Sequence, residues 1–260
     1  MKNKLQLLAL ACAAIPLLGG CAFAGPSQTE TVSETAADVQ DGTASYVEKV
    51  SPSVEDYRLR DNPSIYEDDD IDSVVTMYLT VREGNSAENT DHTWTEINTY
   101  SKYWYEDRGI PQYAVEGILQ VGDENGPLPD EVGYDETVPN AIIKIRGQTS
   151  TQRTQKNYKI ELKDGKGEWR NQRTINLNKH VGEGLRFRNK LAYDLMKEVP
   201  QMMAARTQFV HLYVKDETEG GSGVFEDYGL YTQVEQINGR YLKAHGLDNN
   251  GHLYKNEFFE

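Results

Sequence analysis

Seven short segments rich in β-branched and aromatic residues alternate with turn sequences along the chain, and one longer segment carries apolar residues at helical spacing. Such runs predict strands and a helix, respectively. The strand segments are Val74–Val81, Tyr113–Val121, Ala141–Arg146, Asn157–Leu162, Arg173–Leu177, Thr207–Val214 and Tyr228–Gln236. The helical segment is Leu185–Val199, which ends before Pro200, and a shorter helix follows Asn238 and reaches His245. The order predicts an α+β fold, in which an antiparallel sheet carries one dominant packed helix.

The N-terminus has the composition of an export signal. Two lysines precede an apolar run that is too short to cross a membrane, and the sequence Leu-Gly-Gly-Cys ends at Cys21. This ending resembles the lipobox of bacterial lipoproteins, so residues 1–20 are interpreted as a lipoprotein signal peptide and Cys21 as the lipidated residue. The alternative is ordinary signal cleavage after Ala24. The resemblance implies an extracytoplasmic protein that a lipid on Cys21 anchors to the bacterial membrane or cell surface.

Residues 21–72 are predicted to form a disordered acidic tether. They are rich in Ser, Thr, Asp and Glu, end in the acidic run Glu67–Asp70, and hold too few apolar residues to offset the entropy lost on ordering. Residues 73–260 then form the folded domain. No cysteine lies beyond Cys21, so we expect the core to hold this domain together without a disulfide.

Charge is distributed unevenly along the chain. Residues 22–140 hold 6 Lys/Arg and 26 Asp/Glu, whereas residues 141–192 hold 13 Lys/Arg and 4 Asp/Glu. A basic segment within a chain of net charge −14 predicts an anion-binding site. The overall acidity argues against nucleic acid as a partner.

The basic segment contains a strand, a hydroxyl-rich loop and a second strand that begins with lysines. Its candidate ligand residues are Arg146, Gly147, Thr149, Ser150, Lys156 and Lys159. Glycine lets the backbone approach an oxyanion, hydroxyl and N–H groups donate hydrogen bonds, and lysine supplies compact positive charge. Protein kinases hold phosphates with a similar combination of loop and strand lysine. The alternative is a polar hairpin loop with solvated lysines, which the pattern alone favours.

Strand alternation bears on the role of Lys159. Tyr158, Ile160 and Leu162 share one face of their strand, and Lys159 and Glu161 share the other. If the second face lines a cleft, Lys159 is a phosphate ligand. If that face is open to solvent, Lys159 and Glu161 form a surface pair that contributes little to stability.

Four sequence elements, in this order, resemble the CotH (spore coat protein H) kinase family. The elements are Ile145–Ser150 with Lys156–Ile160, Arg188–Leu195, Tyr228–Ile237 and Gly251–Lys255. They are similar to the family's Arg-Gly-Asn-Ser-Ser loop with its Lys-Lys-Ser-Tyr-Lys strand, to its helix that begins with a basic residue, and to its Gly-Leu-Tyr-x-x-x-Glu-x-Ile and Gly-x-Leu-Tyr-Lys elements. The resemblance covers residues 74–260 and is strongest over 141–260.

The resemblance implies an atypical secreted kinase that uses ATP with Mg or Mn to phosphorylate Ser or Thr of extracytoplasmic proteins. Its fold would resemble the N-lobe of a protein kinase. The residues that would bind the nucleotide are Arg146, Gly147, Thr149, Ser150, Lys156, Lys159, Arg188 and Glu235. Arg188 would contact either a phosphate or Glu161. Glu235 would lie near the nucleotide or would order the end of its strand.

Departures from the family pattern bear on this expectation. Gln155 replaces the first lysine of the Lys-Lys pair, and Gln148 replaces the loop asparagine. In the family, the metal-binding and base aspartates follow the Leu-Tyr-Lys element, so the catalytic residues are expected beyond Glu260. We therefore expect this chain to be a fragment that binds nucleotide poorly and transfers no phosphate by itself.

Two other functions stay open at this point. Tyr100, Tyr103, Trp104 and Tyr105 form an aromatic cluster near Trp94, which is more typical of a core but could stack against a glycan. The chain would then be a noncatalytic surface adhesin or a glycan- or protein-binding lipoprotein. A scaffold of an envelope assembly is a third interpretation. The five histidines show no ligand spacing, so no metal site is predicted.

Overall fold

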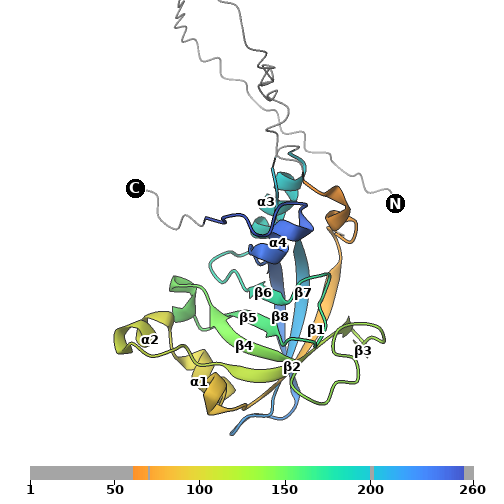
Figure 1. Cartoon of the computed structure of the whole chain (residues 1–260). Helices are drawn as coiled ribbons and strands as arrows, with labels where there is room; N and C mark the ends of the chain where they lie inside the picture. Colours follow the sequence, from red (N-terminus) through yellow and green to blue (C-terminus); the bar gives the residue numbers. More distant parts are fainter. Residues whose placement is uncertain (1–60, 70, 200–201, 255–260) are drawn as a thin grey trace, which may run out of the picture. The chain divides into compact units, whose positions relative to one another are not determined.

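A single sheet of eight strands organises the part of the chain that the computed structural model describes, residues 61–69, 71–199 and 202–254 (Figure 1). The strands are β1 (Val74–Arg82), β2 (Val115–Asp123), β3 (Gly126–Pro127), β4 (Ala141–Arg146), β5 (Asn157–Leu162), β6 (Thr174–Asn178), β7 (Thr207–Asp216) and β8 (Phe225–Glu235). The α-helices are α1 (Trp94–Thr99), α2 (Lys102–Arg108), α3 (Arg188–Lys197) and α4 (Gly239–Ala244), and 3-10 turns form η2 (Pro63–Tyr66), η3 (Ser86–Glu88) and η4 (Thr149–Gln152). The signal peptide, Cys21 and the tether up to residue 60 lie outside the described residues. No helix among those described combines the length and the hydropathy that a membrane span needs.

The sheet is mixed and closes on itself. The strand order is β1-β7-β8-β6-β5-β4-β2-β3, and β1 also pairs with β2. β1 runs parallel to β7, with Thr76 opposite His211, and the other strand pairs of the described residues are antiparallel. The prediction of an antiparallel sheet is therefore wrong for this pair. The parallel pairing is possible because a long connection that contains all the intervening strands joins β1 to β7, whereas a short hairpin would force antiparallel strands.

The core lies on the inner face of the closed sheet. Ile143 and Ile145 of β4 and Ile160 of β5 are buried there, and Lys144 and Lys159 alternate with them on the outer face. The seven predicted strands are all present, with bounds that differ by a few residues, and β3 is an addition. The strands of the sheet were therefore predicted correctly, although the direction of one pairing was not.

Helix α3 packs with a different face from the one that the sequence predicts. Leu191 and Leu195 belong to the apolar stripe that was expected to contact the sheet, but Leu195 is 61% exposed. Lys190 is the buried residue of the helix instead, and its Nζ lies 2.9 Å from Asp194 and 5.5 Å from the ring centre of Phe209 in β7. The aliphatic stem of Lys190 can cover apolar surface while the ion pair satisfies its charge. The expectation of one dominant helix packed through its leucines is corrected accordingly.

Two short helices, α1 and α2, are missing from the sequence prediction. Thr93 and Glu96 form a reciprocal capping box at the start of α1, with N–H···O distances of 2.8 and 3.1 Å. Gly109 ends α2 with a left-handed backbone, at φ 61°. Helices of six and seven residues contain too few turns for apolar periodicity to stand out, so the caps were the available signal.

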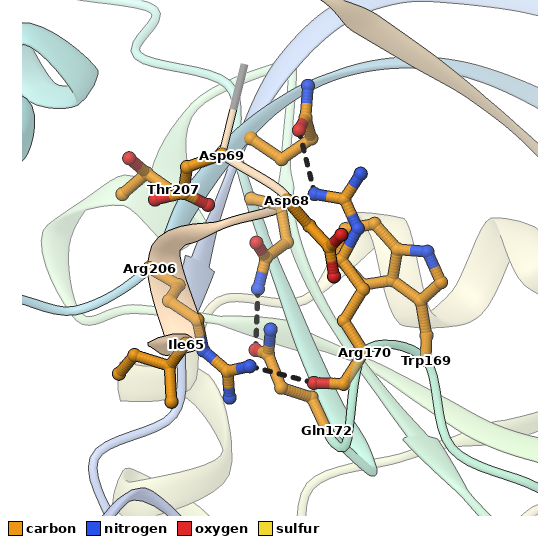
Figure 2. A pocket seen from close by; sticks show the side chains of 10 residues that line it. Ile65, Asp68, Asp69, Trp169, Arg170, Gln172, Arg206 and Thr207 are labelled. Carbon is orange, nitrogen blue, oxygen red and sulfur yellow. Dashed lines mark hydrogen bonds between the residues drawn. The ribbon is translucent and has the colours of Figure 1, made fainter. Parts of the chain in front are cut away.

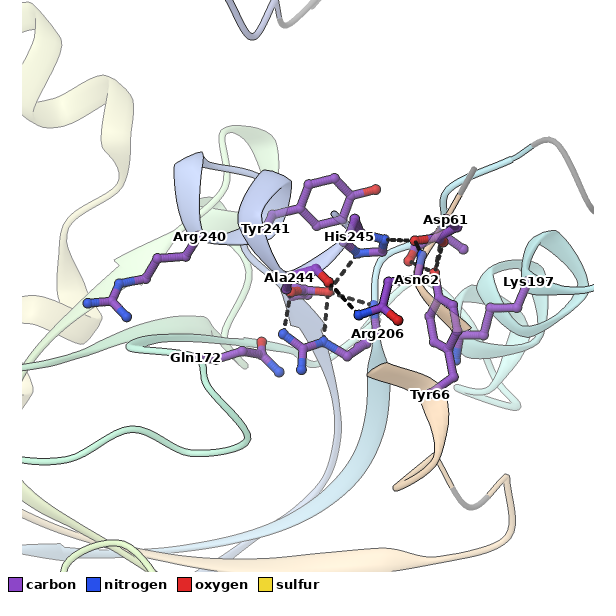
Figure 3. A network of polar contacts seen from close by, with 12 residues as sticks. Asp61, Asn62, Tyr66, Gln172, Lys197, Arg206, Arg240, Tyr241, Ala244 and His245 are labelled. Carbon is purple, nitrogen blue, oxygen red and sulfur yellow. Dashed lines mark hydrogen bonds and ion pairs between the residues drawn. The ribbon is translucent and has the colours of Figure 1, made fainter. Parts of the chain in front are cut away.

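Residues 61–69 form a strap that contacts the domain, although the sequence assigns them to the tether. Asp61 Oδ1 lies 2.5 Å from His245 Nδ1, and Asp61 Oδ2 lies 2.6 Å from the Tyr66 hydroxyl (Figure 3). Asp69 Oδ2 lies 2.5 Å from Lys197 Nζ of α3. The predicted end of the tether at residue 72 is therefore corrected. The acidic residues were expected to be solvated, but here they meet basic partners that are distant in sequence.

Replacing Tyr66 with phenylalanine is expected to lower the free energy of unfolding by about 1–3 kcal/mol. The hydroxyl lies 2.8 Å from the carbonyl oxygen of Ala204 as well as against Asp61, so its loss leaves partly buried groups without a partner. Urea unfolding followed by circular dichroism measures the change. The matched control is Tyr134→Phe at an exposed tyrosine, where we expect a change within about 0.5 kcal/mol. Equal effects of the two substitutions would contradict the role of the strap.

Candidate functional site

The loop between β4 and β5, residues 147–156, is held by its own side chains. Gly147 has φ 97°, and a Cβ at this position would lie 2.1 Å from Ser150 Oγ, so only glycine fits. Thr151 Oγ1 donates to the carbonyl oxygen of Gln148 (2.6 Å), and Lys156 Nζ donates to the carbonyl oxygen of Thr151 (2.7 Å). Lys156 is buried, so it closes the loop from inside.

A depression of about 400 Å³ lies beside this loop. We call it the loop depression, and its lining residues are Thr149, Ser150, Arg153, Asn157, Asn178, His180, Val181 and Gly182. His180 has φ 51°, and its Nε2 atom is buried without a hydrogen-bond partner. Burial lowers the pKa of His180, and Arg186 and Arg146 add to this effect against Glu183. His180 is therefore neutral at neutral pH, so one of its two ring nitrogens is an acceptor.

Cations without a carboxylate partner gather around the loop. Arg146, Arg153, Lys156, Lys179 and Arg186 form no ion pair with any described residue, although most other basic side chains there do. Their contacts are with neutral oxygens instead, such as Arg146 Nη1 to Asn178 Oδ1 (2.5 Å) and Arg186 Nη2 to Gln155 Oε1 (3.1 Å). Because the chain as a whole is acidic, this concentration of unpaired positive charge favours the binding of an anion at this place.

The comparison with protein families matches this part of the molecule. The family model described as CotH kinase protein covers residues 143–259, from β4 through the loop, β6 and α3 to α4 and beyond. Residues 143–259 are thus similar to the CotH kinase family. A search of curated proteins found no match. The resemblance that the sequence motifs indicate is thus confirmed for this segment.

Within the CotH segment, Lys159 is engaged in an ion pair. Its Nζ lies 2.8 Å from Glu161 Oε2 on the outer face of β5, and its side chain is 29% exposed. This hydrogen bond lowers the pKa of Glu161 despite partial burial. Lys144 stands directly opposite Lys159 on β4. Lys159 is not among the residues that line the loop depression, so its contact is the surface pair that the sequence left open as an alternative.

Arg188 lies at the start of α3 and points largely into solvent. Its side chain is 74% exposed, and its Nε lies 3.6 Å from Glu183 Oε1. Glu183 also accepts a hydrogen bond from the backbone N–H of Arg188 (3.0 Å). Neither of the two contacts expected for Arg188, a loop phosphate site or Glu161, is formed by its side chain among the described residues.

Glu235 lies at the end of β8 in a buried polar network and is not among the residues that line the loop depression. Its carboxylate receives hydrogen bonds from Arg206 at 2.5 and 3.1 Å, and His245 Nε2 lies 3.6 Å away. Burial acts to raise the pKa of Glu235, but the adjacent His245 and the hydrogen-bonded Arg206 outweigh it and hold the pKa at about 2. Of the two roles expected for Glu235, this geometry favours ordering the strand end.

A second hollow, close to Arg206, is a packed interior gap (Figure 2). Arg206 Nη1 donates to the carbonyl oxygen of Arg170 (2.8 Å), Arg170 Nη1 donates to Gln208 Oε1 (2.9 Å), and Gln233 Nε2 donates to Gln172 Oε1 (2.9 Å). The enclosed volume is about 10 Å³, which is room for one water molecule at most. We therefore assign no ligand to it.

The residues of the aromatic cluster that suggested glycan binding pack against one another. Trp94 and Tyr105 are buried. The exposed part of the cluster is also engaged, because Tyr100 stacks on Trp104 at 3.9 Å between ring centres and Arg108 lies 4.2 Å from the Trp104 ring centre. These contacts favour the packing interpretation over a glycan platform.

Sequence reasoning missed Asn178 and His180, which lie where β6 ends and line the loop depression. Their position depends on the pairing of β5 with β6, which motif spacing does not encode. The glycines at 182 and 184 indicated a loop at this point and were the available signal. Among the described residues, no three His, Cys, Asp or Glu side chains are grouped so that they could hold a metal ion.

Proposed function

We propose that the loop depression binds the phosphates of a nucleoside triphosphate, and that the chain is the nucleotide-binding part of a CotH-type kinase that phosphorylates Ser or Thr of extracytoplasmic proteins. The observation that carries the proposal is Arg153 in the lining of the loop depression, with the unpaired Arg146 hydrogen-bonded to the lining residue Asn178, together with the match to the CotH family model. Export and lipidation at Cys21 stay predictions from the sequence.

The chemistry of the depression supports an anion of phosphate type. Arg153 and the hydroxyls of Thr149 and Ser150 supply hydrogen-bond donors on one side. Asn157 and Asn178 supply polar groups on the other, and Arg146 is held beside them by Asn178. Guanidinium groups match phosphate oxygens with paired hydrogen bonds, so Arg146 and Arg153 would orient the phosphates.

The order of elements also supports a kinase-like arrangement. Kinases cover the nucleotide phosphates with a glycine-containing loop between two strands and place a lysine on a nearby strand. Here the loop joins β4 and β5, and β6 follows beside β5 with Lys179 directly after it. Helix α3 then precedes β7, and β7 and β8 complete the sheet. We propose that this region corresponds to the N-lobe of the kinase.

The family resemblance also predicts Mg or Mn with the nucleotide. The described residues do not fit such a metal, because they contain no grouping of carboxylates, histidines or cysteines that could hold one. We therefore derive no step through a metal ion. The role we assign to the described residues is to bind and orient phosphates.

Replacing Arg146 with methionine is expected to weaken ATP binding at least tenfold, since a charge-assisted hydrogen bond contributes about 1.5–3 kcal/mol. Isothermal titration calorimetry of the full chain with ATP measures the change. Arg153→Met is the second variant, because Arg153 is exposed and its loss does not threaten folding. Lys166→Met is the control, since Lys166 pairs with Glu136 away from the depression.

Unchanged ATP affinity in both arginine variants, or no saturable ATP binding by the unmodified chain, would overturn the proposal. Lys159→Met in the same assay tests the role that the sequence gives this lysine. Unchanged affinity there would assign Lys159 to its ion pair with Glu161 alone, and a tenfold loss would make it a phosphate ligand.

A further inference from the structure

A third depression lies on the opposite face of β5 and β6 from the loop depression. It has a volume of about 500 Å³, and we call it the inner depression. Its lining residues are Trp94, Thr95, Asn98, Thr99, Tyr158, Tyr228, Tyr231, Lys156, Lys179, Thr154, Gln155, Glu226 and Asp227. None of them lines the loop depression, because successive strand residues point to opposite faces: Asn157 lines one site and Tyr158 the other.

Two buried lysines face this space without a carboxylate partner. Lys156 is 5% exposed and Lys179 is 4% exposed, and neither forms an ion pair within the described part of the chain. Lys179 Nζ donates to the carbonyl oxygen of Tyr228 and lies 4.3 Å from the ring centre of Tyr231. An ammonium group has three donors, and one hydrogen bond is formed by each lysine here. A buried cation without a counter-charge is unfavourable, and a bound anion would relieve that cost.

The positive charge of Lys179 is available at neutral pH. Burial and, to a smaller extent, the nearby Arg186 lower the pKa of Lys179 to about 8, against the opposing effect of Asp227. Asp227 is itself occupied, since its Oδ1 lies 2.7 Å from His211 Nε2. Glu226 is the other acidic residue of the lining.

The remaining walls combine aromatic rings with small polar groups. Tyr158 stacks on Trp94 at 5.0 Å between ring centres, and Trp94 Nε1 donates to the Tyr228 hydroxyl (2.8 Å), so the aromatic wall is rigid. Hydroxyl and amide side chains form the rest of the rim, and Asn98 Oδ1 accepts a hydrogen bond from the Tyr158 hydroxyl (2.8 Å). Aromatic faces, amide and hydroxyl groups and a cation together suit a polyhydroxylated ring that carries an acidic group.

We infer that the inner depression is a second binding site, which takes a sugar-sized organic anion through Lys179, with its carboxylate or phosphate at the ammonium group and its ring beside Tyr228, the partly exposed tyrosine of the lining. The volume lies within the range of small-molecule sites. The site is separate from the nucleotide site proposed above, and its existence does not depend on that proposal.

Calorimetric titration of the full chain with glucuronate, glucose 6-phosphate and neutral glucose tests the inference. We expect at least one of the two anions to bind and glucose to bind at least tenfold more weakly. Binding of glucuronate alone or of glucose 6-phosphate alone identifies the acidic group. Failure of both anions, or equal binding of glucose, would overturn the inference.

Lys179→Met is expected to weaken binding of the anion at least tenfold, and Lys166→Met, at a surface pair with Glu136, is expected to leave it unchanged. Because Lys179 is buried, a second variant guards against loss of the fold: Thr99→Trp, at an exposed helix end, places a ring into the depression and should abolish binding. Unchanged affinity for the anion in either Lys179→Met or Thr99→Trp would contradict the assignment.

Competition separates this site from the nucleotide site. Saturating ATP is expected to leave the affinity for the bound anion within twofold, and Arg146→Met is expected to do the same. Displacement of the anion by ATP would show one shared site and would overturn a second one. If ATP itself does not bind, the titrations with glucuronate and glucose 6-phosphate still decide the inner depression.

Discussion

Replacing Glu235 with alanine is expected to lower the free energy of unfolding by about 3–5 kcal/mol. Glu235 and Arg206 are nearly inaccessible, with side chains 3% and 8% exposed and a closest N···O distance of 2.5 Å. Without the carboxylate, the buried Arg206 guanidinium keeps no ion-pair partner among the described residues, and the His245 ring keeps Asp61. Urea unfolding at neutral pH measures the loss. Glu161→Ala, at the half-exposed pair with Lys159, is the control and should cost less than about 1 kcal/mol.

The substitution Glu235→Ala is also expected to change how the free energy of unfolding depends on pH in acid. The pKa of Glu235 is lowered from 4.5 to about 2 in the folded protein, so the folded state binds this proton less readily than the unfolded state. The stability that results is fully present above about pH 4.5 and is lost as the pH falls towards 2. Glu235→Ala should therefore flatten the stability profile over this interval relative to the unmodified chain. Parallel profiles would show that the ion pair contributes nothing specific.

Replacing Trp94 with alanine is expected to destabilise the domain by about 3–5 kcal/mol. Trp94 is 4% exposed, stacks on the fully buried Tyr158 and donates its indole N–H to the Tyr228 hydroxyl. Its removal opens a cavity beside the inner face of the sheet and leaves that hydroxyl without a partner. The free energy of unfolding in urea measures the effect, and loss of the near-ultraviolet circular dichroism signal at lower urea accompanies it.

The aromatic cluster supplies the matched control for Trp94. Trp104 is partly exposed and makes its main contacts with Tyr100 and Arg108. Trp104→Ala should therefore cost about 1 kcal/mol, the value of a stacked pair at a surface. A larger loss from Trp104 than from Trp94 would mean that the cluster, rather than α1, anchors this side of the core.

Patterns with period two were enough to predict the sheet. Alternation in Asn157–Leu162 placed Tyr158 and Ile160 in the core correctly, and the cap at Asn238 correctly began α4. The buried face of α3 was predicted wrongly. Either a stripe of leucines or a lysine with an ion-pair partner can form such a face, and in this helix Lys190, paired with Asp194, forms it. The parallel pairing of β1 with β7 depends on contacts across more than 120 residues, which local pattern does not carry.

The candidate site was predicted less completely than the fold. The loop from Gly147 and its neighbouring basic residues were identified from type and spacing, and Gly147 does adopt the conformation that glycine alone tolerates. Asn178 and His180 were not identified, because a strand that ends elsewhere in the sequence brings them to the loop. Charge counting located the basic segment, but it did not show which cations are paired. Lys159 pairs with Glu161, whereas Arg146 and Lys179 have no carboxylate partner in the part of the chain that the structure describes.

The pairing of β1 with both β2 and β7 has a consequence for where the folding unit begins. The match to the CotH family starts within β4, so β1 and β2 lie outside it. Without these two strands, β4 and β7 would each present a free edge of backbone donors and acceptors to other chains, and the inner leucines and isoleucines would meet water. The segment recognised by family likeness is thus smaller than the closed sheet, and the residues before it complete the hydrogen bonding of that sheet.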